Sequence, residues 1–487
     1  MIVNTNKKAK REYGDFQTPL ELAQQVCQQL CQLNIHPNII IEPTCGIGNF
    51  IYAATSFFPQ AHKIIGMDIN EQYLQKIQDD KYFVKDHRIE LLHKNFFEVD
   101  WQTYINQLDG EILVLGNLPW VTNSQQGNIG SDNLPKKQNF QKLHGLDAIT
   151  GKSNFDISEW MLIQLVRYLH HRNSNLAMLC KTSVSRKILN YLYSHHLHLE
   201  YCATYAIDAQ KLFGAAVDAC LLFCKFNPDS KNYYCDVFDG FGQQKIKSIG
   251  YKNNILVRDI NSFEKLSGLY NVNNVNTKIN TKPKWRSGIK HDCSNIMELH
   301  RVGDLWMNGL GESVDIEETY LFPLMKGSDI AQNRIQSTNR YVIVPQKFVG
   351  ESTALIKDLA PKTWAYLEAH ASYFNNRKSK IYKKHPSFSI FGVGDYTFTN
   401  WKIAICGLYK KLEFRLVSSF ANKPIVFDDT VYFLGFNNAE LAHKYFELLT
   451  SEQVTSFYSS QIFWDEKRPI KASILNSLNL AALEVEL

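Results

Sequence analysis

Hydrophobic positions alternate between strand-like and helix-like spacing through the first part of the chain. Short apolar runs predict buried strands at residues 39–41, 63–68, 89–92, 112–116, 176–179 and 219–223. Amphipathic spacing predicts helices over residues 17–30, 51–58, 71–78 and 156–170. Strands that alternate with helices build βαβ units, so we expect an α/β fold with a Rossmann-like, doubly wound parallel sheet.

Two polar stretches interrupt this pattern. Residues 122–153 predict a long loop, and the Asn-rich residues 271–282 predict a linker. Beyond the linker the chain is aromatic and basic, with less regular alternation. We therefore expect one domain over 1–270 and a second, α+β domain over 283–487.

Composition narrows the class of protein. The 487 residues carry a formal net charge of +5, which fits a nucleic-acid partner only if the positive charge gathers on one face. No apolar run approaches the ~20 residues of a membrane helix, and the basic N-terminus lacks the apolar core of a signal peptide, so we expect a cytoplasmic protein. The ten cysteines form no CxxC and no Cys/His cluster, so we expect neither zinc nor disulfides.

Two glycines follow the first predicted strand. Gly46 and Gly48 precede a predicted helix, and glycines there let the backbone approach a ligand closely. Asp68 ends the next strand, where a carboxylate can accept hydrogen bonds from both hydroxyls of a ribose. An ordinary turn and a solvent-exposed acid are the alternative interpretations.

The segment that follows the strand at 112–116 is more specific. Asn117-Leu118-Pro119-Trp120 presents an amide oxygen, a backbone carbonyl and a flat ring together. Two acceptors can bind both hydrogens of an exocyclic amino group, whose lone pair is otherwise conjugated into the base, and the ring can hold the base by stacking. The alternative is a tight turn with a buried tryptophan.

Taken in order, these motifs resemble the gamma-class amino-methyltransferases of restriction–modification systems. Those enzymes carry an N-terminal cofactor motif, a glycine loop, a catalytic tetrapeptide and a C-terminal recognition domain. The matching stretches here are residues 14–19, 42–50 and 117–120, and the resemblance spans about residues 12–226. It continues through three stretches similar to a recognition domain, at 285–292, 323–330 and 389–394.

The resemblance implies S-adenosyl-L-methionine as cofactor and assigns residues to it. Thr18, which also suits the N-cap of the first helix, would hold the methionine end together with the glycine loop, and Asp68 would take the ribose. The implied cofactor-binding residues are Thr18, Glu42, Pro43, Cys45, Gly46, Gly48, Asp68, Asn95 and Phe96. Asn95 stands where the family commonly has aspartate; an amide oxygen can accept the same hydrogen bond without charge. Its alternative role is to cap a turn.

The resemblance also assigns the target base. Asn117 and the carbonyl of Leu118 would bind the amino group, followed by Pro119, while Trp120 and Phe213 would stack on the flipped base. The family usually has proline in place of Leu118, but the role there belongs to the backbone. Phe213 as a core aromatic is the alternative.

A stretch of the second domain mixes cations with aromatic residues, which suits contact with phosphates and bases. A solvated basic face is the alternative. The candidate DNA-binding residues are Arg377, Lys378, Lys380, Lys383, Lys384, Lys402, Lys410 and Lys411.

The sequence thus predicts an enzyme that methylates N6 of adenine at a specific site in double-stranded DNA. N4-cytosine methylation, a protein or RNA amino-methyltransferase, and a DNA-binding specificity subunit with a degenerate cofactor site are the alternatives. We expect a monomer that does not bind membranes. No nuclease motif is present in the sequence, so a restriction endonuclease partner would be encoded separately.

Overall fold

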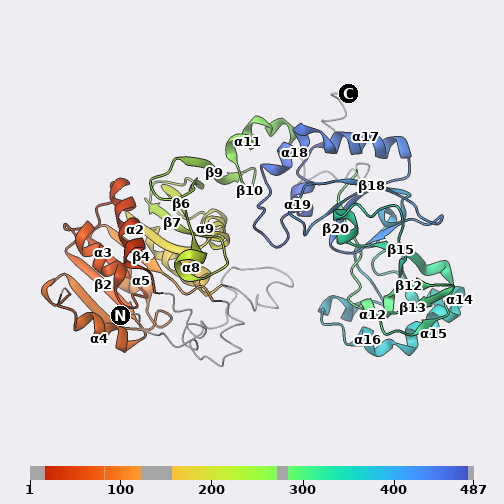
Figure 1. Cartoon of the computed structure of the whole chain (residues 1–487), viewed down its shortest axis with the longest axis horizontal. Coiled ribbons are helices and arrows are strands. Elements are labelled where there is room, and N and C mark those ends of the chain that lie inside the picture. Colours follow the sequence, from red (N-terminus) through yellow and green to blue (C-terminus); the bar gives the residue numbers. More distant parts are fainter. Residues whose placement is uncertain (1–16, 82, 122–155, 271–282, 481–487) are drawn as a thin grey trace. The chain divides into compact units, whose positions relative to one another are not determined.

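A computed structural model of the chain describes residues 17–81, 83–121, 156–270 and 283–480. The predicted loop at 122–153 and the predicted linker at 271–282 therefore lie outside the described residues. The chain divides into two compact units, Met1–Asn261 and Ser262–Leu487 (Figure 1).

The division falls before the expected boundary at residue 270 because two short helices pack on the second unit. These are α11 (Ile260–Lys265) and the 3-10 helix η2 (Ser267–Leu269). The ring of Phe263 lies 6.0 Å from that of Phe457, and the backbone N–H of Asn479 donates to the carbonyl of Leu269 at 2.8 Å.

The first unit contains a ten-stranded sheet in the order β10-β9-β8-β6-β7-β5-β4-β1-β2-β3. Five of its strands are parallel neighbours, as predicted: β1 (Ile39–Glu42), β2 (Lys63–Asp68), β3 (Ile89–His93), β4 (Ile112–Asn117) and β5 (Ser174–Lys181). The Rossmann-like fold expected from the alternation of strands and helices is confirmed.

The other half of the sheet is not purely parallel, which corrects the prediction. Its strands are β6 (Tyr201–Ile207), β7 (Ala219–Phe226), β8 (Tyr234–Phe238), β9 (Lys245–Lys252) and β10 (Ile255–Val257). Strand β7 lies between β5 and β6 and is antiparallel to both. The connection from β6 to β7 holds only the short helix α10 (Ala209–Phe213), which suits an antiparallel return better than a parallel crossover.

Helices pack on the sheet through buried apolar residues. Those of one face are α2 (Leu20–Gln32), α3 (Asn49–Phe57) and α4 (Glu71–Gln78). Leu22, Phe50 and Leu74 share one core cluster with Ile40 and Leu113 of the strands. Successive residues of a strand point to opposite sides of the sheet, so each side can carry its own helices. A second group of helices packs together beside β5: α5 (Trp101–Asn106), α8 (Ile157–Leu169) and α9 (Thr182–Ser194).

The start of α2 differs from the prediction. Pro19, not Thr18, occupies the N-cap position, and no side chain caps the helix. Thr18 precedes the helix and is buried, and its carbonyl accepts a hydrogen bond from the side-chain amide of Asn49 at 2.7 Å. The residue therefore faces the glycine loop instead of the helix end.

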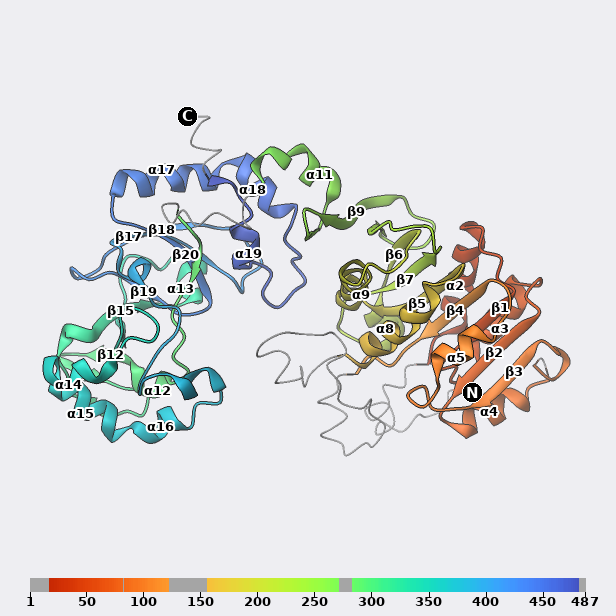
Figure 2. The ribbon, with the colours of Figure 1, turned by 180° about the vertical axis from the view of Figure 1, so that it is seen from behind.

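The second unit is α+β, as expected, and has two sheets (Figure 2). The six-stranded sheet contains β14 (Ser313–Val314), β13 (Leu305–Met307), β12 (Glu298–Val302), β16 (Arg340–Ile343), β15 (Leu321–Met325) and β19 (Val426–Phe427). The four-stranded sheet contains β11 (Arg286–Ser287), β20 (Val431–Phe436), β17 (Trp401–Cys406) and β18 (Arg415–Ser418).

Short helices cluster at the two ends of this unit. Figures 1 and 2 show one group beside the six-stranded sheet: α12 (Ser294–Met297), α14 (Ile356–Leu359), α15 (Pro361–Ala369) and α16 (Ala371–Asn375). The other group lies beside the four-stranded sheet: α17 (Ala439–Thr450), α18 (Glu452–Ser459) and α19 (Ala472–Leu475). Helix α13 (Gly327–Ala331) packs on β17. Among the helices described, none is long and apolar enough to span a bilayer.

The three stretches that resemble a recognition domain meet in this unit. Lys290 and Phe391 exchange backbone hydrogen bonds at 2.8 and 2.9 Å, which joins the first stretch to the third. The second stretch contributes β15, which pairs with β19, and the N–H of Ile289 donates to Phe427 of β19 at 2.8 Å. Segments far apart in the sequence thus share one backbone framework.

Candidate active site

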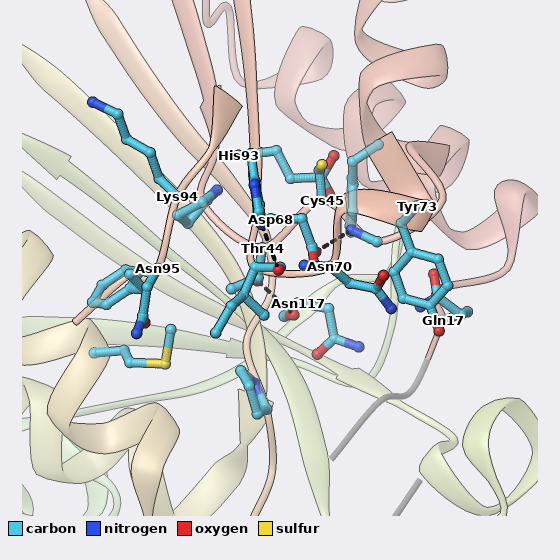
Figure 3. A pocket seen from close by; sticks show the side chains of 18 of the residues that line it. Gln17, Thr44, Cys45, Asp68, Asn70, Tyr73, His93, Lys94, Asn95 and Asn117 are labelled. Carbon is cyan, nitrogen blue, oxygen red and sulfur yellow. Dashed lines mark hydrogen bonds between the residues drawn. The ribbon is translucent and has the colours of Figure 1, made fainter. Parts of the chain in front are cut away.

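A cavity of about 570 Å³ opens at the carboxyl ends of β1, β2, β3 and β4, a volume typical of cofactor sites. Figure 3 shows Thr44, Asp68, Asn70 and Asn117 facing this space, with Asn95 on one side and Tyr73 on the other. Of the residues assigned to the cofactor, Gly48 does not line the cavity, and the residues that do are Thr18, Glu42, Pro43, Cys45, Gly46, Asp68, Asn95 and Phe96.

The shape of the glycine loop depends on the backbone conformation of its two glycines. Gly46 and Gly48 have φ values of +52° and +83°, a region that favours glycine. The N–H of Gly48 donates to the carbonyl of Cys45, and that of Cys45 to the carbonyl of Met67, both at 2.8 Å. The loop therefore turns sharply between β1 and α3 and presents backbone to the cavity.

Asp68 is both a structural and a candidate binding residue. Its Oδ2 accepts the N–H of Gly46 and its Oδ1 that of Asn70, each at 2.8 Å. The side chain is 9% exposed and lines the cavity. These bonds fix the carboxylate at the edge of the cavity.

Glu42 gives the cavity a second carboxyl group. It is 4% exposed, and burial together with the nearby Asp68 raises its pKa well above the usual range. Its Oε2 atom has no hydrogen-bond partner among the described residues. Burial and the charge of Asp68 both disfavour the ionised form of Glu42, and a cation bound in the cavity would favour that form.

The residue before α2 ties the N-terminal motif to the glycine loop. Gln17 Oε1 accepts the N–H of Ile47 at 3.0 Å, next to the bond between Asn49 and Thr18. Thr18 and Gln17 both line the cavity. The motif at the start of the described chain therefore closes one wall of the site.

Only two of the four residues of the predicted catalytic tetrapeptide line the cavity. Asn117 and Pro119 line the cavity, and Thr44 Oγ1 donates to the Asn117 carbonyl at 3.3 Å. Leu118 and Trp120 are buried, at 1% and 6% exposure. Asn117 and Pro119 are thus the residues of the tetrapeptide that face the cavity, and Asn117 brings a polar side chain to it.

Trp120 and Phe213 lie next to each other, edge to face. Their ring centroids are 5.2 Å apart at an interplanar angle of 72°, and Trp120 Nε1 donates to the Leu179 carbonyl at 3.4 Å. Both belong to the apolar core of the first unit, Phe213 at its edge. A base could lie between them only if one ring turned away.

A lysine that the sequence analysis did not identify braces this loop. Lys181, at the end of β5, donates to Asp156 Oδ2 at 2.6 Å and to the Trp120 carbonyl at 3.2 Å. The N–H of Ile157 donates to the Val121 carbonyl at 2.9 Å, so the chain on either side of residues 122–155 is joined. Asp156 also caps α8, accepting the N–H of Ser158 at 3.0 Å. A lysine directly after an apolar strand was the only signal in the sequence.

Asn95 has the capping role that was its alternative interpretation and also lines the cavity. Its Oδ1 accepts the N–H of Phe97 at 3.1 Å, and its Nδ2 donates to Glu98 at 3.3 Å. Phe96 beside it is 6% exposed, and its ring lies 4.7 Å from that of Trp101. The pair forms a rigid polar and aromatic wall.

Several lining residues were missed by sequence reasoning. Asn70, Tyr73 and His93 follow β2 or end β3, and Ile157 and Met161 come from α8. Their position after strands and the four-residue spacing on α8 were available signals. Nothing in the sequence, however, tied α8 to this edge of the sheet.

The candidate DNA-binding residues of the second unit differ in exposure. Six are exposed: Lys378, Lys380, Lys383, Lys384, Lys410 and Lys411. Arg377 is partly buried, donates to the carbonyls of Phe374, Ser389 and His291, and lies 3.6 Å from the Tyr382 ring centroid. These contacts engage its guanidinium within the unit.

Lys402 requires a correction. It is 2% exposed, and its ammonium donates to the Thr399 carbonyl at 2.7 Å. Burial lowers its pKa to about 7. Successive residues of a strand point to opposite sides of the sheet, and the register of β17 turns the Lys402 side chain toward the core. Lys402 is therefore not a surface contact for DNA.

Metal-ligating chemistry adds nothing to this picture. All ten cysteines are free and all but Cys31 are buried. Within residues 17–81, 83–121, 156–270 and 283–480, no group of three or more His, Cys, Asp or Glu side chains could hold a metal ion.

A Rossmann-like sheet with a glycine loop, two carboxyl groups and an Asn-x-Pro segment at its carboxyl edge defines an S-adenosyl-L-methionine-dependent methyltransferase. No family model matches the chain. The chain is 59% identical to the type II methyltransferase M.NspV of Nostoc sp. (strain ATCC 29411 / PCC 7524) over 483 residues, 99% of either chain. It therefore belongs to the type II methyltransferases, the DNA-methylating enzymes of restriction–modification systems.

A solved structure agrees with the fold of the whole chain. The type IIL restriction–modification enzyme MmeI, solved in complex with DNA, superposes with a TM-score of 0.51 and 13% identity. The match covers 97% of this chain and 69% of MmeI. At this identity the likeness concerns the fold alone.

Proposed function

We propose that the protein transfers a methyl group from S-adenosyl-L-methionine to N6 of adenine at a specific site in double-stranded DNA. The observation that carries the proposal is one cavity in which the glycine loop, two carboxyl groups and the amide of Asn117 meet. Membership of the type II methyltransferases supports DNA as the substrate and the cytoplasm as its place of action.

The described residues fit the cofactor. Glu42 and Asp68 suit a molecule that carries a positive sulfonium and an ammonium group, whose charge would favour the ionised form of Glu42. Asp68 would bind the ribose hydroxyls, Thr18 and the glycine loop the methionine end, and Asn95 and Phe96 the adenine. When bound, the cofactor supplies an electrophilic methyl group.

The protein's part in the reaction is to prepare the amino group. The Asn117 amide oxygen and the Leu118 carbonyl would each accept one N–H of the target. Accepting both hydrogens favours the pyramidal nitrogen, whose lone pair is then available, and this preference is stronger in the transition state than in the ground state. Thr44 holds the Asn117 backbone in place through its hydroxyl.

The target base would leave the duplex to reach this amide. An amino group in a base pair faces its partner, so extrusion is required and costs a few kcal/mol. Trp120 and Phe213 are our candidates to stack on the base, after one of the two adjoining rings rotates. Stacking returns roughly 1–3 kcal/mol per base.

The second unit, which we take to begin its recognition role at residue 283, would select the sequence. Its exposed lysines Lys378, Lys380, Lys383, Lys384, Lys410 and Lys411 suit phosphate contacts. A separately encoded restriction endonuclease would cut the same site, and the protein itself would act as a monomer.

The deciding experiment is nucleoside mass spectrometry together with methylation-aware sequencing of DNA from cells that express the protein. We expect N6-methyladenine at one sequence and none in cells that express Asn117→Ala. N4-methylcytosine at one sequence would instead show that the target base is cytosine. Unmodified DNA, with labelled methyl groups found in RNA or protein, would reject the proposal.

A further inference from the structure

A short turn after β16 is braced so that it holds a fixed shape. Gln346 Nε2 donates to the Glu351 carbonyl at 2.6 Å, and the Lys347 N–H donates to the Glu351 carboxylate. The Glu351 N–H closes the turn on the Phe348 carbonyl at 3.2 Å, and Gly350 has φ +91°. Residues 347–351 are called the braced turn below.

The tip of the braced turn is apolar and points to solvent. Phe348 is 57% exposed and Val349 is 41% exposed, whereas Val342 and Ile343 of the preceding strand are fully buried. A single exposed apolar residue needs no explanation. Two neighbouring apolar side chains that a hydrogen-bonded turn holds in solvent do need an explanation, because they contribute little buried surface to the stability of the folded unit.

The braced turn adjoins the basic stretch of the second unit. Gln346 Oε1 accepts the N–H of Ile390 at 2.9 Å, and Thr353 Oγ1 donates to the Ser387 carbonyl at 2.7 Å. Residues 387–390 directly follow the 3-10 helix η5 (Lys380–Lys384). Side-chain bonds on both sides of the turn thus tie it to the chain that carries Lys380, Lys383 and Lys384.

Four exposed lysines belong to the braced turn or to the chain segment tied to it. Lys347, Lys380, Lys383 and Lys384 are exposed, and the carboxylate of the braced turn, Glu351, is directed back to the Lys347 backbone. Two copies of such a surface would repel each other, whereas a nucleic acid offers phosphates to the lysines and apolar base faces to the exposed tip. Charge complementarity therefore favours nucleic acid over a second copy of the chain.

We propose that the braced turn is a DNA contact in which Phe348 packs against bases and the neighbouring lysines bind the backbone phosphates. Apolar side chains at a rigid tip can enter a groove or separate a base step, and the turn is preorganised for this. The proposal rests on the proposed function in that it takes double-stranded DNA as the partner of the second unit.

Binding of the full-length protein to its methylation site, measured over a range of salt concentrations, tests the contact. Phe348→Ala should weaken binding about tenfold, as the loss of one aromatic–base contact does, with no change in the salt slope. The slope counts released counterions, and an apolar contact releases none. Lys383→Gln with Lys384→Gln should instead lower the slope by about 2.

Two further variants complete the design. Phe348→Trp should restore binding, because it keeps a flat apolar side chain. Leu441→Ala is the matched control: Leu441 is 42% exposed on α17, beside the other sheet of the unit, and its loss should leave binding unchanged. Phe348→Ala should unfold at the wild-type temperature, since the ring is exposed.

The outcomes separate this contact from the proposed function. Wild-type protein that fails to bind DNA would reject the proposed function. Wild-type binding with unchanged affinity in Phe348→Ala would overturn the contact alone. A smaller salt slope in Phe348→Ala would also overturn it, as would a dimer of the wild-type protein that this variant dissociates, because the tip would then meet a second copy.

Discussion

The two units use polar residues in opposite ways. In the first unit, Glu42, Asp68 and Asn117 come from different strands yet meet in one cavity. In the second, cations close in sequence have separate fates: Lys383 is exposed, Arg377 is engaged by carbonyls and Lys402 is buried. The carboxyl ends of parallel strands share one edge, whereas antiparallel strands and short helices share none. Position in the sequence is therefore a better guide to a site in the first unit.

The largest expected effect is the loss of the amide that faces the cavity. Asn117→Ala should lower methyl transfer about 100- to 1,000-fold, because it removes an acceptor used in the transition state, and leave cofactor affinity within a few-fold of wild type. Single-turnover transfer and calorimetric titration measure the two properties. Retained turnover would show that the cavity does not act through Asn117.

Next in size is the carboxylate at the end of β2. Asp68→Asn keeps the shape and an acceptor for Gly46 but removes the charge that would bind ribose hydroxyls, each such bond contributing about 1.5–3 kcal/mol. Cofactor affinity measured by titration should fall about 10- to 100-fold. Asp109→Asn, on the surface of the same unit, is the control and should bind normally. Equal affinity in both variants would remove Asp68 from the cofactor site.

The buried lysine of the second unit gives a stability effect. The pKa of Lys402 is about 7 in the fold, against a usual value of 10.5, so the unfolded chain binds the extra proton between these values. Stability should therefore rise with pH from 7 to 10.5, by up to about 1.4 kcal/mol per unit, and the contribution is lost as pH falls through 7.

Lys402→Met should remove this slope. Urea unfolding at several pH values measures it, and Lys410→Met, exposed in the same unit, should keep it. If the two variants behave alike, Lys402 reaches solvent and the contrast between the units is weaker than the structure indicates.

The smallest effect concerns the brace behind the tetrapeptide. Removing Lys181 alone would leave Asp156 as a buried charge, so we pair Lys181→Met with Asp156→Asn, which keeps an N-cap for α8. We expect kcat to fall about tenfold, as a small misplacement of a reacting group does, with the KM for the cofactor unchanged. Lys181→Arg should recover much of the rate, and a fall in melting temperature without a change in kcat would mean a purely structural role.

The sequence anticipated what repeats regularly and missed what depends on packing. Strands β1 and β2, helix α4 and the cavity residues Gly46 and Asp68 follow from periodicity and from glycine before a helix. The burial of Lys402 does not, and that of Trp120 was only the alternative interpretation, because residue type alone does not tell on which side of a strand or loop a side chain falls. Strand β7 was predicted at residues 219–223, but its antiparallel direction was not, since an apolar run carries no direction.

The bond between Val121 and Ile157 has a consequence for how such enzymes can diversify. This bond fixes the two points between which residues 122–155 run, and the entropic cost of joining two fixed points grows only slowly with the number of residues between them. Peptides of other lengths could be grafted between these anchors while β4 and α8 keep their places. The position is thus suited to insertions of new sequence, in evolution or in the laboratory, next to the candidate active site.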